Sequence, residues 1–256
     1  MRTQIGEQIQ YHLPIGEELL HINPFIGKKI QLVFEGQINC QVCGKRTKSS
    51  FGQGSCYNCF ANAPENSPCI INPELCEAHL GKGRDIEYEE RNHNQPHIVY
   101  LAKSSAIKVG VTRETQVPTR WIDQGATEAI ILAEVPYRRL AGEIEVQLKE
   151  HFTDKTNWRK MLKNEVSDLD LLEQKEECLE YYLDEAFHNF VSDNDDILHI
   201  NYPVLEFPDK VKSLSFDKVP IIERTLKGIK GQYLYFENGE VLNIRKHTGY
   251  YITLSV

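Results

Sequence analysis

The sequence lacks any hydrophobic run long enough to cross a membrane. Its longest uninterrupted apolar runs cover five residues, as in Ala129 to Ala133, whereas a membrane-spanning helix needs roughly 20. The first residues, MRTQIGEQIQYHLPIGEE, also lack the apolar stretch of a secretory signal and carry acidic side chains early. We therefore expect a cytoplasmic protein without transmembrane segments.

An excess of basic charge is also lacking. The 256 residues include 29 Lys and Arg against 37 Asp and Glu, a formal net charge of -8. Residues 166–210 alone carry 13 acids and 2 bases, a net of -11, so the rest of the chain sums to +3. This distribution does not exclude a nucleic-acid partner, but it predicts weak non-specific binding.

Internal repeats and low-complexity linkers are absent, and composition divides the chain into consecutive blocks of an α+β protein. Leu169, Leu172, Leu179 and Leu183 are expected to form one face of an acidic helix. Asn238-Gly239 between two β-type runs predicts a hairpin in a β-rich C-terminal part. The expected blocks are N-terminal strands (1–38), a zinc-binding module (39–95), a central strand-and-helix domain (96–164), an acidic helical segment (165–200) and a β-rich region (201–256).

Two cysteine pairs indicate a metal site. A reducing cytoplasm disfavours disulfides, and Cys40-x2-Cys43 is followed after 12 residues by Cys56-x2-Cys59. Each pair has the spacing of a metal-binding turn, and four thiolates complete a closed tetrahedral site for structural Zn²⁺. The alternative is a redox CxxC motif, which normally occurs once and follows a strand. Cys178 is expected to be unrelated to this metal.

A second group of metal ligands is weaker. Pro73 is expected to open a short helix that places Cys76 and His79 on one face, and Cys69 would add a third ligand. His93 could be a fourth. The alternative is that Cys69 and Cys76 are small buried residues.

The central block alternates strands and helices. We expect strands at 98–102 and 107–111 joined by a short polar turn, a helix opened by Pro118, a third strand at 128–135 and a helix at 138–152. The last helix carries one apolar stripe, and Glu145 lies at its margin. Trp121 and Trp158 are expected to be core residues.

The central motifs resemble the GIY-YIG nuclease superfamily, especially its branch with KIG in place of YIG. The resemblance rests on a tyrosine in the first strand, KVG in the second, an arginine on the following helix and IE-x2-L on the next one. The motifs VYLAKSS-x2-KVGVTR, RWIDQGA, KTNW and GIKGQYL, with the cysteine pairs, make nearly the whole chain resemble a bacterial family known as domain of unknown function 2797. These resemblances imply a small antiparallel sheet with flanking helices between the zinc module and the β-rich part.

The nuclease resemblance also implies site residues. Tyr100 corresponds to the tyrosine at or near the general base, Gly110 to the glycine where the backbone meets substrate, and Glu145 to the ligand of Mg²⁺ or Mn²⁺. Arg120 corresponds to the arginine that binds the scissile phosphate, and Arg113 could assist it. Asn157 loosely matches a downstream asparagine of the superfamily. Lys108 stands where many members have tyrosine. Ile98-Val99 also departs from the usual Gly-Ile of the first motif.

Three functions remain open. The first is a metal-dependent nuclease with a structural zinc module. The second is an inactive relative that binds DNA or RNA through Lys45, Arg46 and Lys48 of the zinc module and through the C-terminal strands. The third is a protein-interaction scaffold that uses the acidic helix. Tyr100 as an ordinary strand tyrosine, the arginines as surface cations and Glu145 as a solvated helix acid are the alternatives to the catalytic interpretation.

Overall fold

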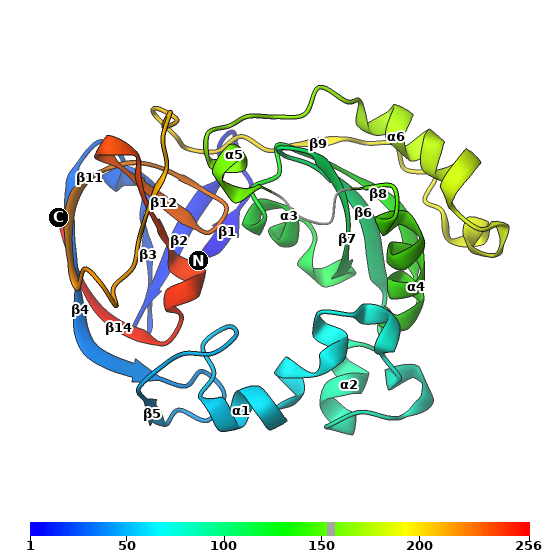
Figure 1. Ribbon diagram of the computed structural model, residues 1–256, viewed down its shortest axis with the longest axis horizontal. Helices are drawn as coiled ribbons and strands as arrows, with labels where there is room; N and C mark the ends of the chain where they lie inside the picture. Colours follow the sequence, from blue (N-terminus) through cyan, green and yellow to red (C-terminus); the bar gives the residue numbers. More distant parts are fainter. Residues whose placement is uncertain (153–156) are drawn as a thin grey trace. The chain divides into compact units, whose positions relative to one another are not determined.

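The computed structural model describes residues 1–152 and 157–256, which form two compact units (Figure 1). The first unit comprises Met1–Ala63, Ile122–Gly125 and Ile200–Val256, and the second comprises Pro64–Trp121 and Ala126–His199. The first and last composition blocks thus contribute to one unit. The cysteine-rich block is divided between the two units after residue 63. No helix in the described part of the chain has the length and apolar character needed to cross a membrane.

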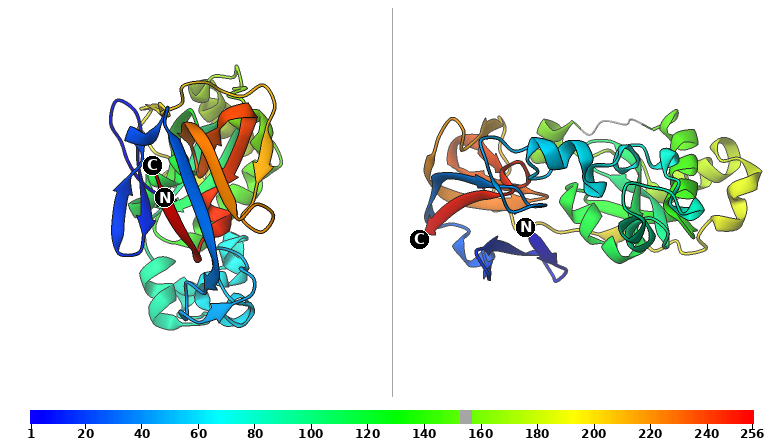
Figure 2. Two further views of the ribbon diagram at one scale, coloured as in Figure 1. Left: turned by 90° about the vertical axis from the view of Figure 1, so that its left-hand side faces the viewer. Right: turned by 90° about the horizontal axis from the view of Figure 1, so that it is seen from below.

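A seven-stranded sheet dominates the first unit. Its strand order is β10-β13-β12-β11-β4-β14, with β5 paired to β4 (Figures 1 and 2). Adjacent strands are antiparallel except β10 and β13. The strands are β4 (Lys29–Asn39), β5 (Arg46–Thr47), β10 (Lys212–Leu214), β11 (Ile221–Lys230), β12 (Tyr233–Phe236), β13 (Glu240–Asn243) and β14 (Tyr250–Ser255).

The long strand β4 joins the N-terminal part of the chain to the C-terminal strands. Val33 lies opposite both Ile221 of β11 and Thr253 of β14. Alternating buried residues such as Ile30 and Leu32 face the core, as a half-buried strand requires. The expected N-terminal and C-terminal strands are therefore present, and the structure shows that β4 and β14 pair in one sheet.

The predicted Asn-Gly hairpin is also present. β12 and β13 pair antiparallel, and Asn238 and Gly239 have φ values of 59° and 69°. Such left-handed values are those that Asn and Gly tolerate best in a tight turn. The remaining strands of this unit form a separate three-stranded sheet, β1 (Arg2–Gln4), β2 (Gln10–Ile15) and β3 (Glu18–His21).

The second unit is built on a four-stranded antiparallel sheet of order β7-β6-β8-β9. The observed elements agree with the predicted hairpin, third strand and two helices of the central block. Their bounds are β6 (His97–Lys103), β7 (Ile107–Arg113), α3 (Thr119–Asp123), β8 (Glu128–Val135), α4 (Arg138–Lys149) and β9 (Leu198–His199).

Helix α4 covers one face of this sheet (Figure 1). Its Ala141, Ile144 and Leu148 are completely buried and share a hydrophobic core with Val99 and Leu101 of β6. The predicted apolar stripe is therefore confirmed. The other helices of the unit are α2 (Ile86–Asn92), α5 (Trp158–Leu162) and α6 (Leu171–Glu177), and α1 (Tyr57–Asn62) belongs to the first unit.

The predicted face of the acidic helix is correct only in its second half, because Leu179 and Leu183 pack in the hydrophobic core whereas Leu169 and Leu172 are exposed. Leu169 and Leu172 are 53% and 37% exposed, whereas Leu171 and Cys178 are completely buried. The helix begins later than expected, because the side chain of Asp170 accepts hydrogen bonds from the N–H groups of Leu172 and Glu173. The cap sets the start of α6, and the buried positions that follow it are Leu171, Lys175 and, directly after α6, Cys178.

Candidate functional site

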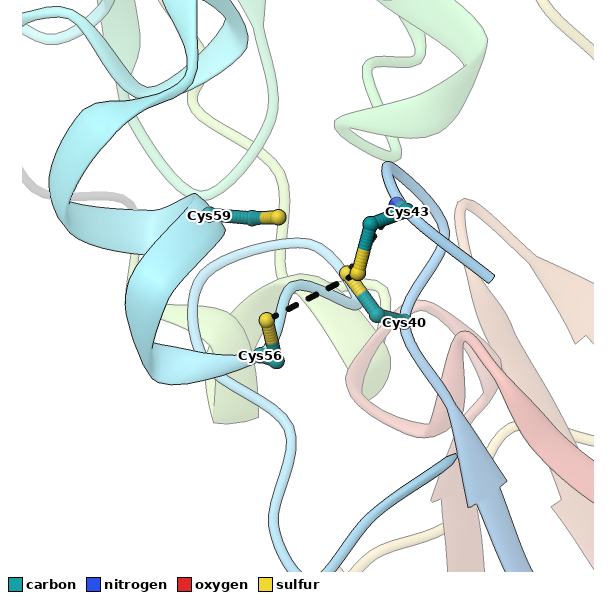
Figure 3. A group of neighbouring side chains, drawn as sticks. All are labelled: Cys40, Cys43, Cys56 and Cys59. Atoms are coloured by element: carbon teal, nitrogen blue, oxygen red, sulfur yellow. Dashed lines mark hydrogen bonds between the residues drawn. The ribbon is translucent and has the colours of Figure 1, made fainter. Parts of the chain in front are cut away.

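The four predicted zinc ligands of the first unit converge. Cys40 directly follows β4, Cys43 lies in the next turn, and Cys56 and Cys59 lie at the start of α1. All four Sγ atoms lie within 4.8 Å of one another, and Figure 3 shows the side chains pointing toward a common centre. The Sγ atoms of Cys43 and Cys56 are 3.9 Å apart. A tetrahedral zinc with Zn–S bonds of about 2.3 Å places its sulfurs roughly 3.8 Å apart, so this cluster could hold a zinc ion.

The backbone around the first cysteine pair forms a tight turn. The N–H of Gly44 donates to the Cys40 carbonyl at 2.9 Å, and Gly44 has a φ of 72°, which glycine adopts without strain. The N–H of Cys43 also points at the Cys40 sulfur, at 3.5 Å. This turn places two thiols and a backbone donor on one side of the chain.

The electrostatics of the cluster are compatible with a bound cation. Burial raises the pKa of the Cys40 thiol, but N–H donors of Cys43 and neighbouring residues oppose this and bring the pKa down to about 6. At Cys59, burial and the sulfurs of the other three cysteines raise the pKa. The first thiolate therefore forms easily and the last with difficulty, because adjacent negative charges repel. A divalent metal removes that repulsion.

The loop that carries the cysteines also carries exposed cations and aromatic rings. Lys45, Arg46 and Lys48 are exposed, and no Asp or Glu occurs between residues 36 and 64. Three rings are also exposed: Phe51 by 37%, Tyr57 by 70% and Phe60 by 42%. Phe51 contacts both others, with ring centroids 5.7 Å from Tyr57 and 5.9 Å from Phe60. We call residues 39–63 the zinc module.

Sequence reasoning identified the cations but missed the rings. Their signal is the interleaving of aromatic residues with the second cysteine pair, in SSFGQGSCYNCF. Large apolar side chains are usually buried, and only the structure shows that these three are exposed.

A groove adjoins the cationic part of the zinc module. Its volume is about 570 Å³, and Arg46 and Lys48 lie on its wall together with Phe34 of β4. The remaining lining residues are Gly36, Ile38, Thr47, Phe216, Asp217 and Pro220. The groove therefore combines two cations with aromatic surface.

The residues implied by the nuclease resemblance occupy the second unit. Tyr100 and Gly110 are paired across β6 and β7, and a Cβ atom placed on Gly110 would lie 2.6 Å from the Tyr100 hydroxyl oxygen. The Tyr100 ring thus lies across Gly110 and also contacts Trp121, at 5.7 Å between centroids. Tyr100 is completely buried. Lys108 lies on the same face of the hairpin as Tyr100, because side chains alternate along a strand.

Tyr100 and helix α4 lie on opposite faces of the sheet. Val99 and Leu101 pack against α4, and alternation along β6 directs Tyr100 away from them. Arg120 is half-buried in α3, next in sequence to the Trp121 that contacts Tyr100. The Arg113 guanidinium donates to Asn92 Oδ1. The roles that the nuclease resemblance implies for these residues stay predictions.

Glu145 lies at the margin of the core, as the helical pattern predicts. It is 8% exposed, and its Oε2 lies 3.2 Å from Lys149 Nζ. Burial raises the pKa of Glu145, while the charges of Lys149 and Arg138 act in the opposite direction. By contrast, Glu143 is exposed at its side chain and pairs with Arg139 at 2.8 Å.

Asn157 is the N-cap residue of α5. Its side-chain oxygen accepts hydrogen bonds from the N–H groups of Arg159 and Lys160, at 3.1 and 3.2 Å, and so caps α5. Lys155 and Thr156 of the KTNW motif lie outside the described residues.

The second predicted ligand group also assembles, with one replacement. Cys69, Cys76 and His93 lie together, and Glu89 joins them. His79 is not in this group. The predicted helix after Pro73 is a single 3-10 turn, Pro73–Leu75, and His79 belongs to a separate turn, Ala78–Leu80. Its ring stacks on Tyr137 at a centroid distance of 4.5 Å.

The sheets and helices together with the metal-ligating side chains define the class of protein. It is an α+β protein with several sheets and a tetracysteine cluster that could hold zinc. The chain belongs to the family described as Protein of unknown function (DUF2797), whose model matches residues 27–252. No curated protein and no solved structure matches the chain.

Proposed function

We propose that this protein binds single-stranded nucleic acid, DNA or RNA, through its zinc module. The observation that carries the proposal is the combination of exposed aromatic rings with cations in a segment free of acidic residues. Bases stack on exposed rings, and phosphates pair with Lys and Arg. The tetracysteine site would hold this loop in one conformation, since zinc binding supplies folding energy to a segment without a large core.

Charge and shape favour a nucleic-acid strand over an acidic peptide. Phe51, Tyr57 and Phe60 present flat surfaces to solvent, and every base offers a matching face for stacking. The groove beside Arg46 and Lys48 adjoins this surface along β4 and β5, with Asp217 as the acidic residue of its lining. A strand that follows this groove could place its phosphates on the cations and its bases on the rings.

Replacing Tyr57 tests this proposal. Tyr57→Ala should weaken binding of a fluorescent single-stranded oligonucleotide by roughly 5- to 150-fold, because one stacked base contributes about 1–3 kcal/mol. Tyr57→Phe should bind like the wild type, since the ring remains. Fluorescence anisotropy with DNA and RNA oligonucleotides supplies the affinities.

The matched control is Tyr181→Ala. Tyr181 is also strongly exposed, at 67%, but lies in the acidic segment. We expect no change in affinity for this variant. If wild-type protein binds neither DNA nor RNA, or if the two alanine variants lose affinity equally, the zinc module is not the binding surface. A wild-type protein that neither binds nor cleaves nucleic acid would favour the protein-interaction scaffold.

A second proposed function is metal-dependent cleavage of phosphodiesters by the central domain. Its support is the order of elements: an antiparallel hairpin carrying Tyr100, a helix carrying Arg120, a third strand, and a helix carrying Glu145. The GIY-YIG resemblance implies the same order. In this proposal Glu145 would hold Mg²⁺ or Mn²⁺, Arg120 and Arg113 would bind the phosphate, and Tyr100 or Lys108 would handle the proton of the attacking water.

We favour nucleic-acid binding over cleavage as the proposed function, because binding uses side chains of the zinc module that are already exposed. Cleavage requires Tyr100 to become accessible and Glu145 to leave Lys149. Glu145→Ala should abolish any cleavage that depends on Mg²⁺ or Mn²⁺, whereas Glu143→Ala, on the exposed side of the same helix, should retain it. Gel assays on single- and double-stranded DNA and RNA with both metals decide this. Cleavage that survives in Glu145→Ala, or none by the wild type, contradicts the second function.

A further inference from the structure

We propose that the second unit contains its own zinc site, formed by Cys69, Cys76, Glu89 and His93. The ligand atoms of these four residues lie within 4.8 Å of one another. All four residues are buried, with exposures between 2% and 7%. The proposal does not depend on nucleic-acid binding.

The geometry fits a small tetrahedral ion. Cys69 Sγ lies 3.8 Å from His93 Nδ1. A tetrahedral zinc with bonds of about 2.3 Å to sulfur and about 2.0 Å to nitrogen places these two atoms roughly 3.6 Å apart. Glu89 and His93 are four residues apart at the end of α2, so both side chains project from the same face of the helix. Two thiolates, an imidazole and a carboxylate form a donor set that zinc accepts.

The burial of Glu89 supports a cation at this position. Its carboxylate contacts His93 Nδ1, and its side chain is only 4% exposed. A buried carboxylate is costly unless a positive charge or several donors compensate for it. Gly83 leaves room for this side chain, because a Cβ atom there would lie 2.2 Å from Glu89 Cγ.

The apolar core around the site is small. The hydrophobic cluster at this position consists of Cys69, Cys76 and Ala78, whereas Ile71 and Leu80 of the same segment are 80% and 55% exposed. Three small side chains bury little apolar surface. A metal that links the turns to α2 would replace the missing core, as in other small metal-stabilised segments.

The site would also hold this segment against α4. Arg138 of α4 donates to the carbonyl oxygens of Cys69 and Ile70, at 2.9 and 3.1 Å. A cavity of about 350 Å³ reaches Cys69 and Glu89 from outside and provides an entry path for the ion. The zinc would therefore have a structural role, because it would stabilise the position where the turns contact α2 and α4.

Metal analysis of full-length wild-type protein tests the site directly. Elemental analysis should find about two zinc ions per chain. Zinc X-ray absorption should give, averaged over both ions, about three sulfur ligands and one nitrogen or oxygen ligand per zinc. One zinc per chain with four sulfur ligands would overturn the proposal. This measurement needs no variant, so a folding defect cannot obscure the result.

Variants then identify the ligands. Cys69→Ser and His93→Ala should each reduce the zinc content from two ions to one and leave the all-sulfur signature of the first site. His79→Ala is the matched control, because it removes a nearby histidine outside the group and should retain both ions. If His79→Ala loses one zinc and His93→Ala keeps two, the assignment is wrong.

Discussion

Tyr100 has room for its ring because residue 110 is glycine. Any side chain at position 110 would overlap the phenol, at 2.6 Å for the hydroxyl oxygen and 2.7 Å for Cζ. The nuclease resemblance implies that the Gly110 backbone meets substrate, whereas the structure shows a side chain of the adjacent strand at this position. A period-two pattern shows which face a residue occupies and does not show what covers that face. The exposed rings of the zinc module were not predicted either, because a sequence pattern does not show which neighbours cover a side chain.

His97 should make stability depend on pH. It is completely buried in β6, and burial lowers its pKa from 6.5 to about 4, although the Gln95 carbonyl opposes the shift. The folded state therefore prefers the neutral ring. Its contribution is fully present above pH 6.5 and is lost as the pH falls toward 4, by up to about 3 kcal/mol.

Denaturant unfolding of wild type and His97→Gln between pH 7 and 4.5 measures this effect. Loss of zinc at low pH affects both proteins, so the difference between their pH slopes reports on His97. We expect a shallower decline in the variant. Equal slopes would show that His97 does not control the acid sensitivity.

At the scale of elements, strong periodicity predicted most of the second unit. The third strand, β8, has the bounds that its sequence indicated, and the apolar stripe of α4 is buried as expected. The first half of the acidic helix was predicted wrongly, because its pattern allows more than one buried face and Asp170 determines where α6 begins. Glu89 was missed as a ligand although Glu-x3-His on one helix face was a readable signal. Charged residues in an acidic run are usually solvated, and the tertiary turn that brings Cys69 to them has no local signature.

Gly142 tests how α4 docks on the turns of the second metal site. A Cβ atom there would lie 2.2 Å from the backbone nitrogen of Glu74. Gly→Ala inside a helix normally adds up to about 1 kcal/mol of stability. Here we expect the opposite sign, a loss of about 1–3 kcal/mol, because backbone must move to make room.

Urea unfolding of Gly142→Ala gives the sign. Val146→Ala serves as the control on the same helix, since Val146 is 43% exposed and its loss should change stability by less than about 0.5 kcal/mol. A Gly142→Ala protein as stable as the wild type or more stable would contradict the close contact between α4 and the Glu74 backbone.

At the scale of the whole chain, segments that are far apart in the sequence belong to the same unit. Strand β4 of the N-terminal part and the last strands share one sheet, and the zinc module of residues 39–63 belongs to that unit. Composition predicted the two kinds of structure but not this grouping, because pairing between strands nearly 200 residues apart leaves no local pattern. The charge is also uneven at this scale: a chain of net charge -8 has no Asp or Glu in its zinc module.

The most direct test of the central claim is the salt dependence of nucleic-acid binding in two charge-matched variants. Lys45→Gln with Lys48→Gln removes two exposed cations of the zinc module. Lys210→Gln with Lys212→Gln removes two exposed cations from another part of the same unit. For the first pair we predict weaker binding of a single-stranded oligonucleotide and a decrease of about 1.4 in the slope of log affinity against log salt, since each phosphate contact contributes about 0.7. The second pair should retain the wild-type slope, and equal slopes for the two double variants would contradict binding by the zinc module.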